Sequence, residues 1–141
     1  RMKLDEGNMI PDFISNALEN KDLEILGDEN FFSSFCYISD CLDAVIKMMA
    51  SNLSGPLNVG SDVDINISDL AKIIIKNIGS SSKINYAKKI LFMTPLCSPD
   101  ISKIRNELSW LPVVTLEKGI AKTIEDLRAS KGLLSIKNLE R

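Results

Sequence analysis

The chain has 141 residues, of which 45% are hydrophobic and 26% are charged, and its formal net charge is −2. This composition is typical of a globular domain with a buried core, and a net charge near zero gives no electrostatic reason to expect nucleic acid or a membrane as a partner. The sequence contains no histidine, which excludes Ser–His and Cys–His nucleophile pairs and histidine metal sites.

The three cysteines, Cys36, Cys41 and Cys97, are odd in number and lack the spacing of a metal site. This pattern favours a reduced, cytoplasmic protein without a bound metal. No apolar run approaches the roughly 20 residues of a membrane-spanning helix, and no secretory signal is visible. The chain begins at Arg1 rather than at methionine, which indicates a piece of a longer protein.

The first half of the chain predicts two amphipathic helices separated by two extended segments. Apolar residues follow a helical period from residue 10 to residue 18, with Pro11 in the first turn, where a missing N–H is harmless. A strand over Leu23–Leu26, a polar turn over 27–30 and a second extended run lead to a helix opened by Ser39 or Asp40. The apolar face that we expect to be buried in this helix contains Leu42, Val45, Ile46 and Met49.

The second half alternates short strands with helices. Strands are predicted over 57–60, 62–67 and 83–87, and a loop with two prolines over 88–99. Ser68 is expected to cap a helix that Gly79 ends. Asp100 starts a short helix, and Thr115 caps the last helix. The apolar faces of the two longer helices contain Ala71, Ile74, Ile75 and Ile78, and Ile120, Thr123, Ile124 and Leu127.

The alternating order of the elements predicts an α/β fold. Strands this short and scattered do not form a large sheet of their own, so a dependent lobe that leans on a bigger sheet elsewhere fits better than a self-contained fold. We expect this lobe to span residues 1–130 and residues 131–141 to form a C-terminal tail.

A series of motifs, in the same order, resembles the extended short-chain dehydrogenase/reductase family, the NAD-dependent nucleotide-sugar epimerases, dehydratases and decarboxylases. Residues 23–28, 34–40 and 55–60 are similar to its Leu-x-Val-Tyr-Gly-Asp, Ser-Phe-x-Tyr-Val-x-Asp and Gly-x-x-Asn-Leu-Gly motifs. Residues 99–103, 108–112 and 116–120 resemble its closing Pro-Asp-Ile-Ser-Lys, Leu-Gly-Trp-x-Pro and Leu-Glu-Glu-Gly-Leu. The segment over 1–14 resembles the one after its Asn-x-Tyr-Gly-Pro. The decarboxylase branch of the family is the most similar.

The resemblance implies that this chain is the small C-terminal substrate-binding lobe, whereas an N-terminal Rossmann domain, absent here, binds NAD and carries a catalytic Tyr-x-x-x-Lys pair. The glycines of this chain come no closer than Gly55 and Gly60, so no Gly-x-x-Gly fingerprint exists. Tyr37 and Tyr86 are followed four positions later by cysteine and isoleucine, not by lysine. We therefore expect no catalytic residue, no bound cofactor and no catalysis from this chain alone.

The matched positions imply contacts with a nucleotide sugar. Met9 and Ile10 match the segment beside the nucleotide, although Ile10 is equally well explained as helix core. Asn58 matches an asparagine on the substrate side, or else its amide pins the corner between strand and loop. The strand residues that would contact the base are Glu24, Ile25 and Leu26. Leu26 replaces the family's tyrosine in this strand, so aromatic stacking is lost.

Further positions depart from the family. Its first diphosphate-clamping arginine corresponds to Ser33, and its second to Cys97 or Ser98; neither a hydroxyl nor a thiol replaces a guanidinium. Either another cation substitutes, with Lys88 and Lys89 near in sequence, or the substrate differs, or this copy is degenerate. Ser109 stands where the family has a glycine at a helix end, which implies some backbone strain.

The resemblance also implies the partners of the longer protein. These are a UDP-, dTDP- or GDP-linked sugar, the protein's own N-terminal Rossmann domain and a second copy in a homodimer. No nucleic acid and no membrane are expected as partners. The missing arginines motivate an alternative hypothesis, in which the chain is a non-catalytic binding or interaction module derived from the substrate-binding lobe.

Overall fold

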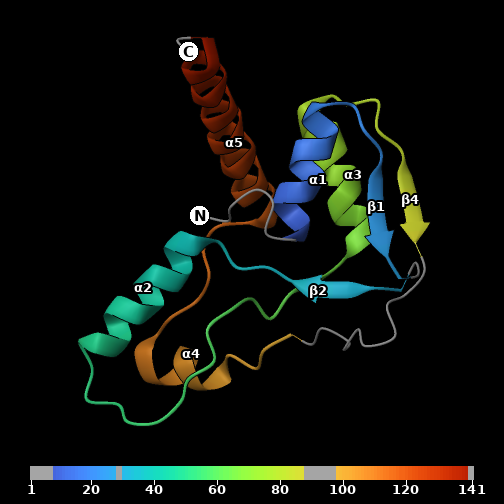
Figure 1. Cartoon of the computed structure of the whole chain (residues 1–141). Helices are drawn as coiled ribbons and strands as arrows, with labels where there is room; N and C mark the ends of the chain where they lie inside the picture. Colours follow the sequence, from blue (N-terminus) through green and yellow to red (C-terminus); the bar gives the residue numbers. More distant parts are fainter. Residues whose placement is uncertain (1–7, 28–29, 88–97, 140–141) are drawn as a thin grey trace.

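The computed structural model describes residues 8–27, 30–87 and 98–139, with side chains up to residue 130. Helices and short strands alternate along this part of the chain, which confirms the predicted α/β class (Figure 1). The elements are α1 (Met9–Leu18), β1 (Leu23–Leu26), β2 (Phe32–Ser34), α2 (Ile38–Met49), β3 (Asp64–Asn66), α3 (Ile67–Ile78), β4 (Ile84–Ala87), α4 (Ser102–Leu108) and α5 (Leu116–Leu139).

The larger part of the molecule packs helices onto a parallel pair of strands. β1 pairs with β4, with Leu23 opposite Ile84, and both α1 and α3 contact β1. Side chains alternate along β1, so that Leu23 and Ile25 are buried while Glu24 and Leu26 are exposed. The strand predicted from the sequence is therefore confirmed, with one face on the core.

One apolar core joins these elements to the first half of α5. Its buried residues are Phe13, Ile14, Ala17, Leu23, Ile25, Ile67, Leu70, Ala71, Ile74, Ile120, Ile124 and Leu127. The helical periods predicted for α1, α3 and α5 supply most of this list, so those three stripes are confirmed. Each of these helices buries one face against the others, as an amphipathic surface helix does.

A second pair of strands lies at the lower end of this core. β2 and β3 are antiparallel, with Phe32 opposite Asn66. The prediction that Ser68 caps α3 is wrong by two residues: Asn66 is the cap, and its side-chain Oδ1 accepts a hydrogen bond from the Ser68 backbone N–H at 2.8 Å. The helix therefore begins at Ile67, and the half-exposed strand predicted over 62–67 shrinks to β3.

The remaining elements form a smaller part, at the lower left of Figure 1, made of α2, α4 and the loops between them. Its core is a cluster of the buried residues Ala44, Ile101, Ile104 and Trp110. Trp110 is completely buried, and its indole Nε1 donates a hydrogen bond to the Asp40 backbone carbonyl at 3.1 Å. This contact joins the first turn of α2 to the connection between α4 and α5.

Two predictions about α2 are wrong. The helix begins at Ile38, not at Ser39 or Asp40, and Tyr37 is its N-terminal cap residue. Its apolar face is not buried: Leu42, Val45, Ile46 and Met49 are all exposed. The side that faces the rest of the chain carries Asp40 and Ala44 instead, because the Asp40 carboxylate is held by backbone N–H groups of the distant 113–114 segment.

The strand predicted over 57–60 is also wrong. Leu57 and Val59 are half-buried against the Trp110 cluster, but neither of the two sheets formed by the described residues includes this segment. A strand forms only where it can pair by backbone hydrogen bonds with a neighbouring strand, and the described part of the chain has no such neighbour for residues 57–60.

The helix ends agree better with the sequence. Gly79 ends α3 in the left-handed conformation with a φ of 73°, and Thr115 Oγ1 accepts a hydrogen bond from the Lys118 backbone N–H at 3.4 Å in the first turn of α5. The Asp100 carboxylate accepts one from the Ser102 N–H at 2.9 Å at the start of α4. α5 continues past residue 130 to Leu139. Most of the loop predicted over 88–99 lies outside the described residues.

Candidate functional site

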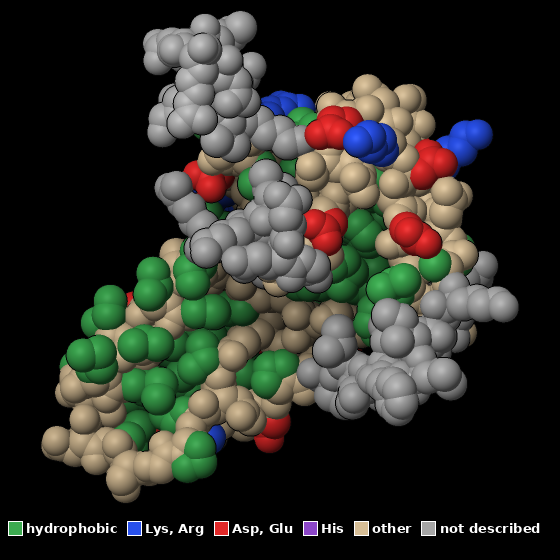
Figure 2. All heavy atoms as spheres, in the orientation of Figure 1, with side chains coloured by type: hydrophobic (Ala, Val, Ile, Leu, Met, Phe, Trp, Pro, Cys, Tyr) green, Lys and Arg blue, Asp and Glu red, His purple; other side chains and the backbone are tan. Residues whose placement is uncertain are grey.

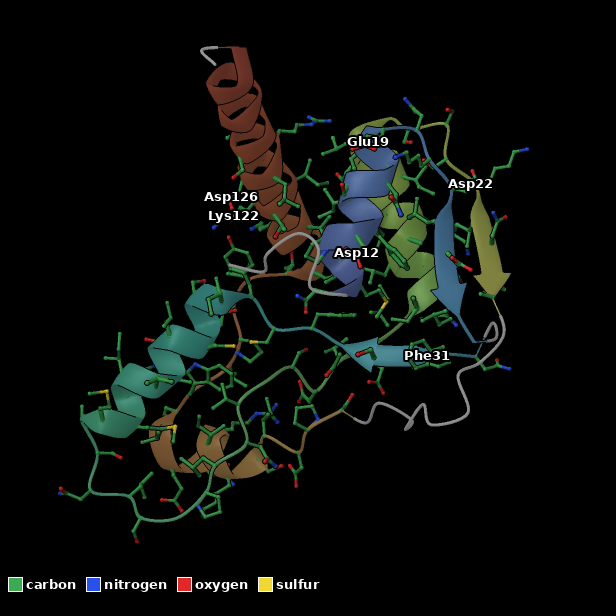
Figure 3. The ribbon with its side chains drawn as sticks, viewed as in Figure 1. Asp12, Glu19, Asp22, Phe31, Lys122 and Asp126 are labelled. Atoms are coloured by element: carbon green, nitrogen blue, oxygen red, sulfur yellow. The ribbon has the colours of Figure 1, made fainter. Side chains whose placement is uncertain are left out.

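Several of the predicted contact residues lie at one edge of the larger part. α1 begins and β1 ends at this edge, and β2 runs across it toward the smaller part (Figure 1). The edge is apolar: Met9, Ile10, Phe31, Phe35 and Ile65 are all half-buried and pack against the main core. Figure 3 labels Phe31 directly before β2. Apolar side chains of this kind typically line small-molecule sites.

The strand residues of this edge differ in what they can offer. The Ile25 side chain is only 2% exposed and lies in the core, so a ligand can reach its backbone at most. Glu24 and Leu26 point the other way, and Leu26 is 42% exposed. Leu26 is thus the apolar side chain of β1 that is free to contact a planar ring.

Ser33 and Ser98 both lie at the β2–β3 pair, but on opposite faces of it. Ser33 is buried in β2, where Ser34 stands opposite Asp64 of β3, and the Ser98 hydroxyl donates a hydrogen bond to the Asp64 carboxylate. Of the two positions implied for a diphosphate clamp, Ser33 is therefore turned toward the interior, and Ser98 is held by Asp64 on the exposed face of the pair. Cys97, the other candidate for the second clamp, lies outside the described residues.

Asn58 lies in the segment over 50–63, which connects α2 to β3. Its amide Nδ2 donates a hydrogen bond to the Asp100 backbone carbonyl at 3.0 Å. Next to it, a Cβ at Gly60 would stand 2.7 Å from Cγ of Pro99, so the two segments approach closely. This geometry agrees with the structural explanation of Asn58, in which its amide pins a corner of the chain.

A cleft of about 860 Å³ opens on another side, between the start of α2 and α5. Of the predicted contact residues, Ile10 lines it. Its wall is built by Tyr37, whose ring lies against Gly119 and under the Lys122 ammonium, 5.3 Å from the ring centroid. A Cβ at Gly119 would stand 3.1 Å from the Tyr37 ring. Figure 3 shows Lys122 and Asp126 on the side of α5 near the start of α2.

Sequence reasoning missed the role of Asp40. This carboxylate is 4% exposed, and its Oδ2 accepts hydrogen bonds from the backbone N–H groups of Val113 at 3.0 Å and Val114 at 2.9 Å. We name this contact the Asp40 latch. An aspartate in a first helical turn suggests a dipole interaction, and nothing in its sequence neighbourhood points to partners more than 70 residues away.

Cys36, beside the latch, shows no sign of catalytic reactivity. Burial raises the pKa of the Cys36 thiol to about 12, and the adjacent Cys41 thiol and Asp40 carboxylate add to the shift. The thiol form therefore dominates at neutral pH, whereas a nucleophilic cysteine needs a lowered pKa. Within the described residues, no group of three or more acidic or cysteine side chains is placed to hold a metal ion.

Comparison with known proteins agrees with the resemblance seen in the sequence. Residues 1–60 match the NAD dependent epimerase/dehydratase family. UDP-glucuronic acid decarboxylase 1 of Xenopus tropicalis is 33% identical over 128 residues, which cover 91% of this chain and 30% of that protein. UDP-glucuronic acid decarboxylase 3 of Arabidopsis thaliana is also 33% identical over 128 residues, covering 91% and 37%. The chain thus spans about a third of the length of these curated relatives.

Solved structures show the same fold. UDP-glucose 4-epimerase from Thermotoga maritima, crystallised with UDP-glucose, superposes with a TM-score of 0.84 at 22% identity, over 90% of this chain and 41% of that one. UDP-glucuronic acid 4-epimerase from Bacillus cereus, in complex with UDP-glucuronic acid and NAD, gives 0.77 at 26% identity, over 86% and 40%. None of the described helices meets the length and hydropathy needed to cross a bilayer.

Proposed function

We propose that this chain, which has the sequence motifs and the fold of part of an extended short-chain dehydrogenase/reductase in the NAD-dependent epimerase/dehydratase family, is the nucleotide-sugar-binding portion of a longer enzyme. The observation that carries the proposal is the 33% identity to a UDP-glucuronic acid decarboxylase across 91% of this chain. The enzyme would be an epimerase, dehydratase or decarboxylase whose catalytic pair and cofactor belong to an N-terminal domain.

The residues of this chain do not fit NAD. The sequence has no Gly-x-x-Gly turn, and Gly60, one of the two glycines nearest each other in sequence, packs against Pro99 with no room for a side chain. NAD in the longer protein would therefore bind the N-terminal Rossmann domain, where it supplies reversible oxidation of the sugar. As given, the chain is catalytically incomplete.

The apolar edge suits the nucleotide half of the substrate. Met9 and Ile10 at the start of α1 and Leu26 on the exposed face of β1 each offer an apolar side chain against which a base could rest, with backbone groups to fix its edge. Ser33 and Ser98 stand at the sequence positions of the two clamping arginines, but the Ser33 side chain is buried and the Ser98 hydroxyl already donates to the Asp64 carboxylate. Hydrogen bonds from neutral hydroxyls to a diphosphate are weaker than charge-assisted ones, so we expect weaker binding than in a relative that keeps both arginines.

The test is nucleotide-sugar binding by the full-length protein. Isothermal titration with UDP-, dTDP- and GDP-linked sugars, with NAD present, should show saturable binding of one of these classes. Because the similar proteins include UDP-glucuronic acid decarboxylases, UDP-glucuronate is the first ligand to try. Turnover should be present in the full-length protein and absent from the 141-residue chain.

A second candidate function rests on the missing arginines at 33 and 97–98. If no nucleotide sugar binds the full-length protein while a protein partner does, the chain is a non-catalytic binding module derived from this lobe. The same outcome would remove the enzyme proposal. A homodimer of the full-length protein and a cytoplasmic location are parts of the proposal that sedimentation and cell fractionation would check.

A further inference from the structure

Cys36 and Cys41 occupy two positions at the start of α2 whose side chains commonly touch each other. Tyr37 is the N-terminal cap residue, so Cys36 directly precedes the cap and Cys41 is the fourth residue of the helix. Apolar side chains at these two positions often pack together, an arrangement called a hydrophobic staple. In this chain both positions carry a free thiol. The fold therefore brings two cysteines to the first turn of one helix.

The contacts around the Tyr37 carbonyl show that the two side chains meet. This oxygen accepts a hydrogen bond from the Cys41 backbone N–H at 3.3 Å, and the Cys36 thiol donates to the same oxygen at 3.8 Å. The two thiols are also hydrogen-bonded to each other. Disulfide formation requires two sulfur atoms that approach without a backbone rearrangement. A pair of thiols already in contact meets this requirement by rotation of the side chains.

The pair is within reach of a small oxidant. Both cysteines are half-buried and line the cleft of about 860 Å³ between the start of α2 and α5. Figure 2 shows apolar side chains gathered over α2 at the lower left of the molecule. Hydrogen peroxide is small and uncharged, so it loses little hydration free energy on approaching such a surface, whereas a charged oxidant such as oxidised glutathione loses more.

We propose that Cys36 and Cys41 form a reversible disulfide on exposure to hydrogen peroxide, which makes the start of α2 a redox-sensitive site. This inference goes beyond the proposed function and does not depend on it. In reducing compartments, disulfides of this kind are transient and serve redox sensing. The bond would fasten the connection between β2 and α2 to the first helical turn, next to the Asp40 latch.

The reaction begins at Cys41, because the Cys36 thiol ionises too little at neutral pH to attack first. The Cys41 thiolate attacks one peroxide oxygen, so that an S–O bond forms and the O–O bond breaks. The hydroxide that leaves takes up the proton released by Cys41 and becomes water. The Cys36 sulfur then attacks the Cys41 sulfur, and the second hydroxide leaves with the Cys36 proton as water. The two thiols lose two electrons in total, and the peroxide gains them.

The experiment uses peptide mass spectrometry on the reduced full-length protein after treatment with hydrogen peroxide. Free thiols are blocked with N-ethylmaleimide before digestion with trypsin. The tryptic peptide over 22–47 contains both cysteines and no internal lysine or arginine. A disulfide predicts that this peptide carries no maleimide and is lighter than its reduced form by two hydrogen atoms. Treatment with dithiothreitol before blocking should restore a maleimide group on each cysteine.

Two serine variants test the assigned order of the steps. Cys36→Ser removes the second thiol, so the sulfenic acid formed at Cys41 should persist and be trapped by dimedone. Cys41→Ser is the matched control, because it keeps the Cys36 thiol alone, and it should take up about tenfold less dimedone at pH 7. If either variant fails to fold, the peptide measurement on the unmodified protein still decides.

Hydrogen–deuterium exchange provides a structural readout of the bond. In the oxidised full-length protein, amides of the first turn of α2 should exchange about tenfold more slowly than in the reduced protein, because the bond restricts local opening. Amides of α3, which contains no cysteine, serve as the control and should exchange at equal rates in the two forms.

Three results would contradict the disulfide. They are a 22–47 peptide that keeps both maleimide groups after peroxide, a bond from either cysteine to Cys97 or to a cysteine elsewhere in the protein, and sulfinic acid at Cys41 without any bond to Cys36. Titration with nucleotide sugars separates this inference from the proposed function. Sugar binding without the disulfide removes this inference alone, and the disulfide without sugar binding removes the proposed function alone.

Discussion

At the scale of single residues, Cys36 offers a direct check on the environment between α2 and its neighbours. Because burial raises its pKa to about 12, the thiolate fraction at pH 8 should be much lower than in the unfolded chain. We expect iodoacetamide to alkylate Cys36 slowly in the native protein, with a rate that keeps rising above pH 9.

Peptide mass spectrometry after alkylation in buffer and in urea would measure this difference. The urea sample is the control, since unfolding returns the thiol to its ordinary pKa. Equal rates in the two conditions would show that Cys36 is neither buried nor shifted. The same raised pKa also makes the folded state less stable as the pH rises above 9, because the unfolded thiol ionises first.

Ser109 gives a second residue-scale prediction. It ends α4 with a φ of 47°, in the left-handed region that glycine adopts without a Cβ clash. Ser109→Gly should therefore stabilise the protein by about 0.5–1 kcal/mol, as measured by urea unfolding. The comparison is Asn20→Gly, at a φ of 53°, where Oδ1 accepts hydrogen bonds from the Ser81 N–H and from serine hydroxyls. We expect that variant to lose stability, so a similar gain at both positions would refute the strain argument.

At the scale of the elements, the Asp40 latch fixes the orientation of α2 against the connection between α4 and α5. Asp40→Ala leaves the N–H groups of Val113 and Val114 without their charged acceptor, which should cost about 3 kcal/mol in a urea melt. Asp40→Asn keeps one acceptor oxygen and should lose about half as much. Hydrogen exchange should then quicken in 38–49 and 110–114, but not in α3. A loss confined to α3 would place the latch outside the coupling between α2 and the α4–α5 connection.

The β1–β4 pair carries a pH-dependent contact. The Asp22 carboxylate accepts hydrogen bonds from the Lys83 backbone N–H at 3.0 Å and from Asn85 Nδ2 at 3.1 Å, and these bonds hold its pKa below 3.8. A lowered pKa in the folded state means that the contribution is present above pH 3.8 and is lost as the pH falls through the lowered value. The stability difference between the wild type and Asp22→Asn should thus be larger at pH 7 than at pH 2.5. Equal differences in thermal midpoints at the two pH values would contradict this prediction.

The elements also show what the sequence could predict. The stripes of α1, α3 and α5 were identified because each helix buries one face locally, and a period of 3.6 residues reports that face directly. The same pattern on α2 identified its apolar face but not what covers it, since the partner of a face is a non-local property. The error at 57–60 has the same cause, because strand pairing depends on a partner that the described residues do not include.

The features of the candidate site also fall into those that the sequence motifs identified and those that they did not. Motif order identified Met9, Leu26 and Ser33 as candidate contact residues, and their contact with a ligand stays a prediction. It did not predict that the Ile25 side chain lies in the core. For Asn58, the alternative of an amide that pins a corner of the chain agrees with its hydrogen bond to the Asp100 carbonyl. The Asp40 latch joins residues more than 70 positions apart, and no local pattern encodes such a contact.

At the scale of the whole molecule, the proposed site predicts that one substitution should strengthen ligand binding. Leu26 lies at the exposed end of β1, 42% accessible, where the family motif has a tyrosine. Leu26→Tyr in the full-length protein would add a ring on which the base of a nucleotide sugar can stack. Stacking of a base on an aromatic side chain contributes about 1–3 kcal/mol, so the affinity should rise by at least about fivefold.

Titration calorimetry with UDP-glucuronate and with UDP alone would measure the gain for each ligand. A rise of the same size for both ligands is expected, because the ring acts on the base and not on the sugar. Leu26→Ile is the control, since it keeps an apolar side chain of equal size without a π-face and should leave the affinity unchanged. If Leu26→Tyr folds normally and binds no better than Leu26→Ile, the base does not rest on β1, and the nucleotide must lie elsewhere along the apolar edge.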